Sequence, residues 1–89
     1  MNAKEMFEKL GYENDEVNEH CLGYGKLLNN RKKYITFNDS GNCKWFTIIE
    51  SDRNNPTIDL DELQAINKQV EELGWNERWN KRTYAKLRW

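Results

Sequence analysis

Two stretches of this chain carry complete helix start signals, one near the start of the chain and one after residue 56. In "NAKEMFEKLGY", Asn2 and Glu5 have the spacing of a capping box, in which each residue's side chain bonds the other's backbone N–H. In "TIDLDELQAINKQVEELGW", Asp59 and Glu62 repeat that spacing. Any fold of this chain must therefore accommodate one short helix near the start and a longer helix after residue 59.

Apolar residues at helical spacing identify the face that each helix should bury. The expected buried residues are Ala3, Met6, Phe7 and Leu10 in the first helix, and Leu63, Ile66, Val70 and Leu73 in the second. Gly11 and Gly74 follow these stripes and are placed to end each helix in a left-handed conformation. Tyr12 is expected to fold back onto Phe7.

The middle of the chain is predicted to form strands. "KKYITFN" and "CKWFTIIES" flank "DSGN", a turn in which Gly41 is expected to have a positive φ. If Asn38 pairs with Cys43, Ile35 lies opposite Phe46 and Phe37 opposite Lys44.

Alternation along these strands predicts two different sheet faces. Ile35, Phe37, Phe46 and Ile48 share the face that receives the helices, and Tyr34, Trp45 and Thr47 share the other with Thr36. A weaker strand is expected within "VNEHCLGYGKL", and "NNRKK" is expected to be the loop that joins it to the next strand.

This order predicts a two-layer α+β domain over residues 1–75: an N-terminal helix, a three-stranded antiparallel sheet and a C-terminal helix. Residues 76–89 form a separate basic and aromatic extension, expected to be a short helix. Nothing before the extension covers the second sheet face, so Tyr34, Trp45 and Thr47 are expected to be exposed unless the extension folds across them.

If residues 77–88 are helical with Asn76 as the cap, the extension has two distinct faces. One face carries Trp79, Thr83, Tyr84 and Leu87, and the other carries Arg78, Lys81, Arg82, Lys86, Arg88 and Trp89. The first face can pack on the domain. The second offers cations for phosphate and an aromatic ring for a base, and it equally suits an acidic patch on a protein.

Three further residues are candidates for the same binding surface. Lys32 and Lys33, with Lys26 and Arg31 nearby, can extend the positive charge if their loop lies on the same side of the molecule. Trp45 is the aromatic candidate on the open sheet face.

Composition narrows the possible partners only slightly. The chain has 89 residues, 33% of them charged, and a net charge of −1, so its overall charge names no partner. The charge is nevertheless distributed in blocks: residues 23–33 carry four basic residues and no acid, and residues 76–89 carry five basic residues and one acid. A nucleic-acid mimic needs a strong acidic field, which this chain lacks.

The residues that usually carry catalysis are sparse. His20, the single histidine, neighbours Cys21, but strand neighbours point to opposite faces and cannot act as nucleophile and base. One His and two scattered Cys do not suit a zinc site. "GYGK" at residues 23–26 lacks the length of a phosphate loop. We therefore predict no catalytic residue, no metal and no cofactor.

No apolar run is long enough to cross a membrane, and no signal peptide is recognised at the start. The expected location is the cytoplasm, with Cys21 and Cys43 reduced. No membrane partner is expected.

"MNAKEMFEKLGYE" and "LDELQAINKQVEELGW" resemble the two ends of small uncharacterised phage and prophage proteins of Gram-positive bacteria. The resemblance is close over residues 1–13 and 58–75 and is loose in the strands. Proteins of that family often end soon after the Gly-Trp, which marks residues 76–89 as an extension. The shared motifs are helix signals, so the resemblance carries over no functional residue.

These observations favour a non-catalytic binding protein of a phage or mobile element, acting in the cytoplasm of a bacterial host cell. It is expected to engage an unidentified host or phage protein as an accessory factor or inhibitor. The alternative is a nucleic-acid-binding protein that uses the extension and the basic loop. Formation of a homodimer through the Trp45 face or the extension is compatible with both.

Overall fold

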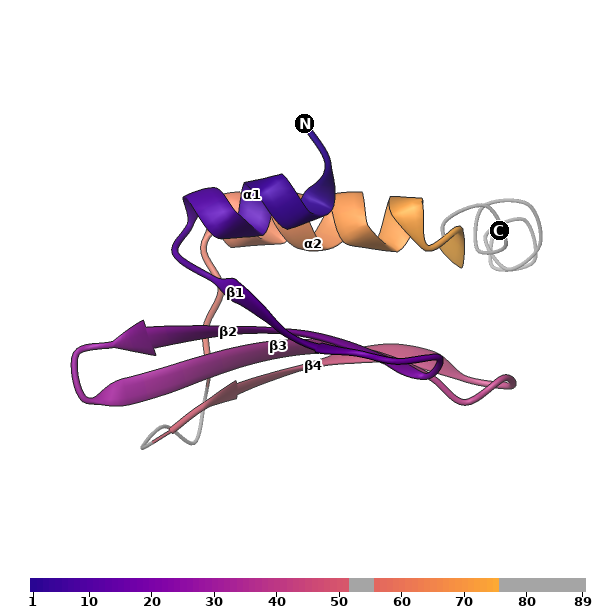
Figure 1. Cartoon of the computed structure of the whole chain (residues 1–89), viewed down its shortest axis with the longest axis horizontal. Coiled ribbons are helices and arrows are strands. Elements are labelled where there is room, and N and C mark those ends of the chain that lie inside the picture. Colours follow the sequence, from indigo (N-terminus) through magenta and orange to yellow (C-terminus); the bar gives the residue numbers. More distant parts are fainter. Residues whose placement is uncertain (52–55, 76–89) are drawn as a thin grey trace, which may run out of the picture.

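The computed structural model describes residues 1–51 and 56–75. Figure 1 shows a helix, an antiparallel sheet and a second helix in sequence order. The elements are α1 (Ala3–Lys9), β1 (Glu13–Val17), β2 (Cys21–Leu28), β3 (Arg31–Asp39), β4 (Lys44–Glu50) and α2 (Leu60–Glu72). The α+β class is confirmed. The predicted helix over residues 77–88 lies outside the described residues.

Both predicted capping boxes are present. The Asn2 side chain accepts the backbone N–H of Glu5, and the Glu5 side chain accepts that of Asn2. Asp59 and Glu62 make the equivalent pair at the start of α2. These four hydrogen bonds satisfy backbone donors that have no partner inside a helix, which explains why both helices begin where the sequence indicates.

The sheet has four strands in the order β1-β2-β3-β4, so the prediction of three strands is wrong. The missing strand is β1, which pairs antiparallel with β2 and contains an irregularity between Asn14 and Glu16. Its sequence, ENDEV, has no apolar alternation because four of its five residues are exposed at the edge of the sheet. Backbone hydrogen bonds to β2 keep β1 in the sheet. Such bonds do not depend on side-chain type, so the sequence pattern does not reveal them.

The connection between β2 and β3 is also shorter than predicted. Arg31, Lys32 and Lys33 belong to β3, and Arg31 pairs with Leu28, so only a two-residue turn remains of the expected "NNRKK" loop. Asn29 has a φ of 52° in that turn, a conformation that Asn tolerates better than most residues. The basic residues therefore alternate between the two faces of a strand.

The turn of the β3–β4 hairpin lies one residue later in the chain than predicted. Phe37 pairs with Phe46 and Asp39 with Lys44, a shift of two residues from the expected register. The turn closes through a hydrogen bond of 3.0 Å from the Ser40 N–H to the Cys43 carbonyl. Because side chains alternate with a period of two, this shift leaves every residue on its predicted face.

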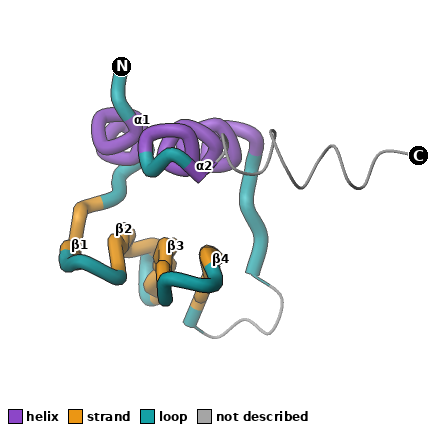
Figure 2. The backbone as a smooth tube through the Cα atoms, turned by 90° about the vertical axis from the view of Figure 1, so that its right-hand side faces the viewer, coloured by secondary structure: helices purple, strands orange, loops and turns teal. Residues whose placement is uncertain are grey.

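The two helices lie side by side on one face of the sheet (Figure 2). This gives the predicted two layers, and no described element covers the opposite face of the sheet. We call these the inner and outer faces. The outer face carries Lys32, Tyr34, Thr36 and Asn38 from β3, and Trp45, Thr47 and Ile49 from β4.

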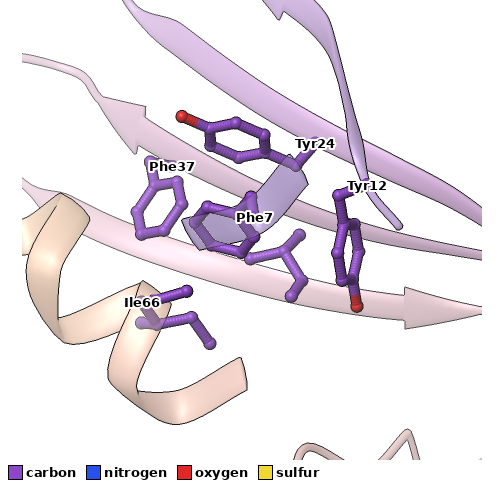
Figure 3. Packing of buried hydrophobic residues seen from close by; sticks show 7 residues of the cluster. Phe7, Tyr12, Tyr24, Phe37 and Ile66 are labelled. Carbon is purple, nitrogen blue, oxygen red and sulfur yellow. The ribbon is translucent and has the colours of Figure 1, made fainter. Parts of the chain in front are cut away.

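The core is a compact aromatic cluster between α1, α2 and the inner face (Figure 3). The Phe7 ring stacks on Tyr24 with centroids 4.0 Å apart and meets Tyr12 edge-on at 5.5 Å. The buried hydrophobic cluster comprises Phe7, Tyr12, Tyr24, Ile35, Phe37, Ala65 and Ile66. Large rings supply the apolar area that a chain with few hydrophobic residues needs.

The predicted buried stripe of α2 is only partly correct. Ile66 is buried, but Leu63 and Leu73 are more than a third exposed, and the polar residues Glu62 and Gln69 are buried instead. Gln69 accepts a hydrogen bond of 2.6 Å from the Tyr24 hydroxyl. The rotation of this helix about its axis is therefore set by hydrogen bonds of Glu62 and Gln69 to Tyr12, Tyr24 and Lys33. Hydrophobic periodicity alone does not reveal such contacts.

Candidate functional site

A buried ion pair joins the sheet to the start of α2. The Lys33 Nζ lies on the inner face of β3 and donates to Glu62 Oε1 at 2.9 Å and to the Thr57 carbonyl. Lys33 is 4% exposed and Glu62 is 3% exposed. At such burial each charge needs a partner, since an unpaired ion would cost several kcal/mol.

The same carboxylate is bonded from two further directions. The Tyr12 hydroxyl donates to Glu62 Oε2 at 2.5 Å, and the Asp59 N–H donates to Glu62 Oε1 at 2.9 Å. Glu62 is therefore at once the capping-box residue of α2 and the centre of a polar cluster beneath that helix.

A second carboxylate, from Glu50 at the end of β4, completes the cluster. Its Oε1 lies 3.7 Å from Lys33 Nζ and accepts the Thr57 N–H at 3.0 Å, and its Oε2 lies 3.9 Å from an Arg31 nitrogen. Lys26 contributes a third cation, with its Nζ 4.0 Å from Glu62 and 4.8 Å from the centre of the Tyr12 ring.

The electrostatics of this cluster favour one protonation state. Burial alone would raise the pKa of Glu62, but hydrogen bonds from Tyr12, Lys33 and Asp59 outweigh it, so the pKa is lowered. Burial and the neighbouring Glu62 carboxylate raise the pKa of Tyr12. Glu62 is thus held as the anion and Tyr12 as the neutral phenol.

The polar groups of the cluster bond one another, and Lys26, Arg31, Lys33, Glu50 and Glu62 also line an open pocket at the surface. Within the described part of the chain, no buried side-chain nitrogen or oxygen lacks a hydrogen-bond partner. Glu62 is engaged by three donors, and the opposing charges lie against one another. We interpret the cluster as the connection that holds α2 on the sheet.

Lys33 was a candidate surface residue, and the structure places it inside this cluster. The sequence did contain a signal for this: Lys33 has the same strand parity as Ile35 and Phe37, which are buried on the inner face. Lys32, one residue earlier, is exposed on the outer face. The two lysines therefore do not form one basic surface.

Trp45 is the third described candidate, and it lies on the open face as predicted. It is 44% exposed, and Ile49 on the same strand and face is 56% exposed. Thr47 is exposed between them, and Tyr34 from β3 is half-buried beside Ile49. Together these four residues form an exposed patch, called here the Trp45 patch.

Glycines of β2 leave room on the outer face for side chains of the neighbouring strands. Gly25 pairs with Tyr34, whose ring lies so close over it that an added Cβ would be 3.0 Å from the ring. The adjacent position on β2 is Gly23, which pairs with Thr36. The glycines of "GYGK" thus lie within a strand, where side chains of β1 and β3 pack over them.

The remaining candidates, Arg78, Lys81, Arg82, Lys86, Arg88 and Trp89, lie outside the described residues.

The two residues weighed for catalysis are not arranged for it. His20 is exposed, with Nδ1 3.2 Å from the Asp39 carbonyl oxygen. Burial and a hydrogen bond with Glu16 raise the pKa of Cys21, which disfavours the reactive thiolate. Among residues 1–51 and 56–75, no group of three or more His, Cys, Asp or Glu side chains could hold a metal ion.

Comparison of the chain with protein-family models, with curated proteins and with solved structures finds no match. Neither helix of the described chain has the length and apolar character required to cross a membrane.

Proposed function

We propose that this chain is a non-catalytic binding protein of a phage or mobile element that contacts a host or phage protein through the outer face of its sheet. The phage origin rests on the resemblance of residues 1–13 and 58–75. The binding role rests on the distribution of polar and apolar groups between the two faces.

The observation that carries the proposal is the Trp45 patch. Trp45 and Ile49 expose large apolar side chains on the sheet face that no described element covers (Figure 2). Buried aromatic anchors dominate the energetics of protein interfaces, and Trp is prominent among them. The polar groups of the inner cluster are, by contrast, already engaged with one another.

The proposal is tested by capture with a matched pair of variants. Immobilised full chain, Trp45→Ala and Leu60→Ala are exposed to a lysate of Gram-positive bacteria, and retained proteins are quantified by mass spectrometry. Leu60 is an exposed apolar residue in the helical layer, away from the outer face. Leu60→Ala therefore controls for nonspecific hydrophobic binding.

We expect a discrete protein that the wild type and Leu60→Ala retain equally and that Trp45→Ala retains at least tenfold less, the cost of losing one interface anchor. Circular dichroism checks that each variant is folded.

Direct nucleic-acid binding is the competing function, since residues 76–89 carry five basic residues. Anisotropy of labelled single-stranded and duplex oligonucleotides at two salt concentrations tests it with the same proteins. Micromolar binding that falls steeply with salt and is unchanged in Trp45→Ala, with no protein captured through Trp45, would replace our proposal with this one.

A further inference from the structure

The outer face of the sheet carries acidic residues of β1 beside the Trp45 patch. Glu13 pairs with Gly25 and Glu16 with Gly23, and directly opposed residues of an antiparallel pair lie on the same face. Gly25 is in turn opposite Tyr34, which belongs to the outer face, and Gly23 has the same strand parity. Both glutamates therefore lie on the outer face.

The irregularity in β1 adds a third carboxylate to this face. Asp15 lies between Asn14 and Glu16 and has no partner residue in β2. Its carboxylate lies directly over Gly25, where an added Cβ would overlap it and would also be 3.0 Å from the Tyr34 ring. An extra residue in a strand commonly redirects a side chain in this way. The bulge and the glycine together place the Asp15 carboxylate beside an aromatic ring of the Trp45 patch.

The outer face is therefore acidic as well as apolar. Within the four strands it carries three carboxylates, those of Glu13, Asp15 and Glu16, and one cation, that of Lys32. All four side chains belong to exposed residues. In the described part of the chain, no ion pair includes any of the three carboxylates. Their charges are thus balanced by solvent and not by the protein.

Two of these carboxylates line an open pocket of about 430 Å³ with the Tyr34 ring. Carboxylates and aromatic rings both attract an organic cation, and the pocket has room for one Lys or Arg side chain. Lys26 and Lys32 also line the pocket, but neither forms an ion pair with Glu13 or Asp15 among the described residues. The pocket therefore offers unpaired negative charge to a cation from outside the domain.

A partner that covers the Trp45 patch has to satisfy these carboxylates. Gly25, Tyr34 and Ile49 form one row across β2, β3 and β4, so the Asp15 carboxylate over Gly25 is only about two strand spacings, roughly 10 Å, from Ile49. An interface that spans this row removes water from Asp15. An anion that loses its water without gaining a cation opposes binding, and an acidic partner would add repulsion. The occupant of this face must therefore supply a cation.

We propose that the outer face receives a segment of the partner protein that is both basic and apolar. A Lys or Arg side chain of that segment lies beside Asp15 and the Tyr34 ring, and its apolar side chains pack on Trp45 and Ile49. The inference rests on the proposed function and adds the chemistry of the partner. It also disfavours nucleic acid on this face, since the same carboxylates repel phosphates.

The first test uses two synthetic helical peptides with the same Leu and Trp positions. One carries Arg about two helical turns from these apolar residues, roughly 10 Å away, and the other carries Gln there. Each peptide is titrated into the isotope-labelled full chain at low salt and followed by NMR. We expect the Arg peptide to shift the amide signals of Gly25, Tyr34, Trp45 and Ile49 and to bind at least fivefold tighter than the Gln peptide. Equal affinity of the two peptides, or no shift of these signals by either, would overturn the proposal.

A matched pair of variants locates the charge that the Arg peptide recognises. Asp15→Asn removes a carboxylate from the outer face without changing its size, and Glu71→Gln removes an exposed carboxylate from α2, in the other layer. We expect Asp15→Asn to weaken the Arg peptide at least threefold and Glu71→Gln to change it less than 1.5-fold. Equal weakening by both variants would indicate general charge attraction and contradict the proposal. Circular dichroism checks folding, and Glu13→Gln takes the place of Asp15→Asn if that variant does not fold.

Trp45→Ala separates this inference from the proposed function. Weaker binding of the Arg peptide to both Asp15→Asn and Trp45→Ala supports the two together. Binding that needs Trp45 but is the same in Asp15→Asn, and is unchanged between about 50 and 500 mM salt, would keep the outer face as the docking surface and overturn only the basic chemistry of the partner. Binding that is unchanged in Trp45→Ala would remove the Trp45 patch from the interface and overturn both.

Discussion

At the scale of one residue, the Glu62 carboxylate serves both a local helix signal and a contact between distant parts of the chain. Its carboxylate closes the capping box of α2 and also neutralises Lys33, 29 residues earlier in the chain. Breaking a buried ion pair by removing one member is costly because the other charge remains buried. The stability of the domain should therefore depend strongly on this one negative charge.

Glu62→Gln is expected to lower the free energy of unfolding by about 3 kcal/mol at pH 7. Glutamine keeps the shape and can still accept hydrogen bonds, but it brings no charge to Lys33. Urea unfolding measures the change. Glu71→Gln is the control, because the Glu71 side chain is exposed and, among the described residues, contacts Lys68 at the surface, so the change should cost less than about 0.5 kcal/mol.

The acid dependence of the same variant adds a second readout. Because the pKa of Glu62 is lowered in the folded state, its contribution is present above its ordinary value of 4.5 and is lost as the pH falls through the folded value. Wild type should therefore lose stability below about pH 4.5 more steeply than Glu62→Gln. Parallel curves for the two proteins would show that Glu62 is not the group that titrates.

At the scale of elements, the helices are specified locally and the strands are not. α2 begins at its cap because the Asp59 side chain accepts the Glu62 N–H at 2.8 Å, an interaction within three residues. β1 has no such signal, since an exposed polar strand is defined only by its pairing with β2. The number of strands was therefore mispredicted while both helix starts were predicted correctly.

Asp59→Ala should destabilise the domain by about 1 kcal/mol, the usual cost of an N-cap, because a backbone N–H of α2 loses its acceptor. In a domain of this size that corresponds to a fall in Tm of about 4–8 °C. Asp61→Ala is the matched control: it removes an acid from the same turn without removing the cap. Equal shifts for the two variants would mean that charge near the helix start, and not the cap, is responsible.

At the scale of the whole molecule, Phe7 connects the two layers. It lies in a helix of only seven residues, which is too short to be stable alone, and its ring is enclosed by Tyr12, Tyr24 and Phe37. Packing of Phe7 on the sheet therefore sustains α1, and the helix in turn closes the core.

Phe7→Ala is expected to lower the free energy of unfolding by about 3–5 kcal/mol, since it leaves a cavity among rings that cannot collapse into it. For a small domain this is a large part of the total stability. Denaturant unfolding followed by near-ultraviolet circular dichroism measures it. Phe46→Ala, at a ring that is 40% exposed, should cost less than half as much, and similar losses for the two would contradict the assigned core.

The features that could be predicted from the amino-acid sequence are those that depend on neighbours in the chain. Capping boxes predicted where both helices begin, and Gly11, Gly41 and Gly74 adopt the predicted positive φ. Strand parity assigned residues 34–37 of β3 and 45–48 of β4 to their correct faces. Trp45 on the open face follows from the same parity. These features are local because each depends on atoms only a few residues apart.

The existence of β1, the rotation of α2 and the burial of Lys33 were not predicted from the sequence, because long-range contacts set them. Each depends on a partner far along the chain: β2 for the backbone of β1, Tyr24 for Gln69, and Glu62 for Lys33. A buried polar group is tolerated only where its partner is also buried, and that pairing is known only once the layers are in contact.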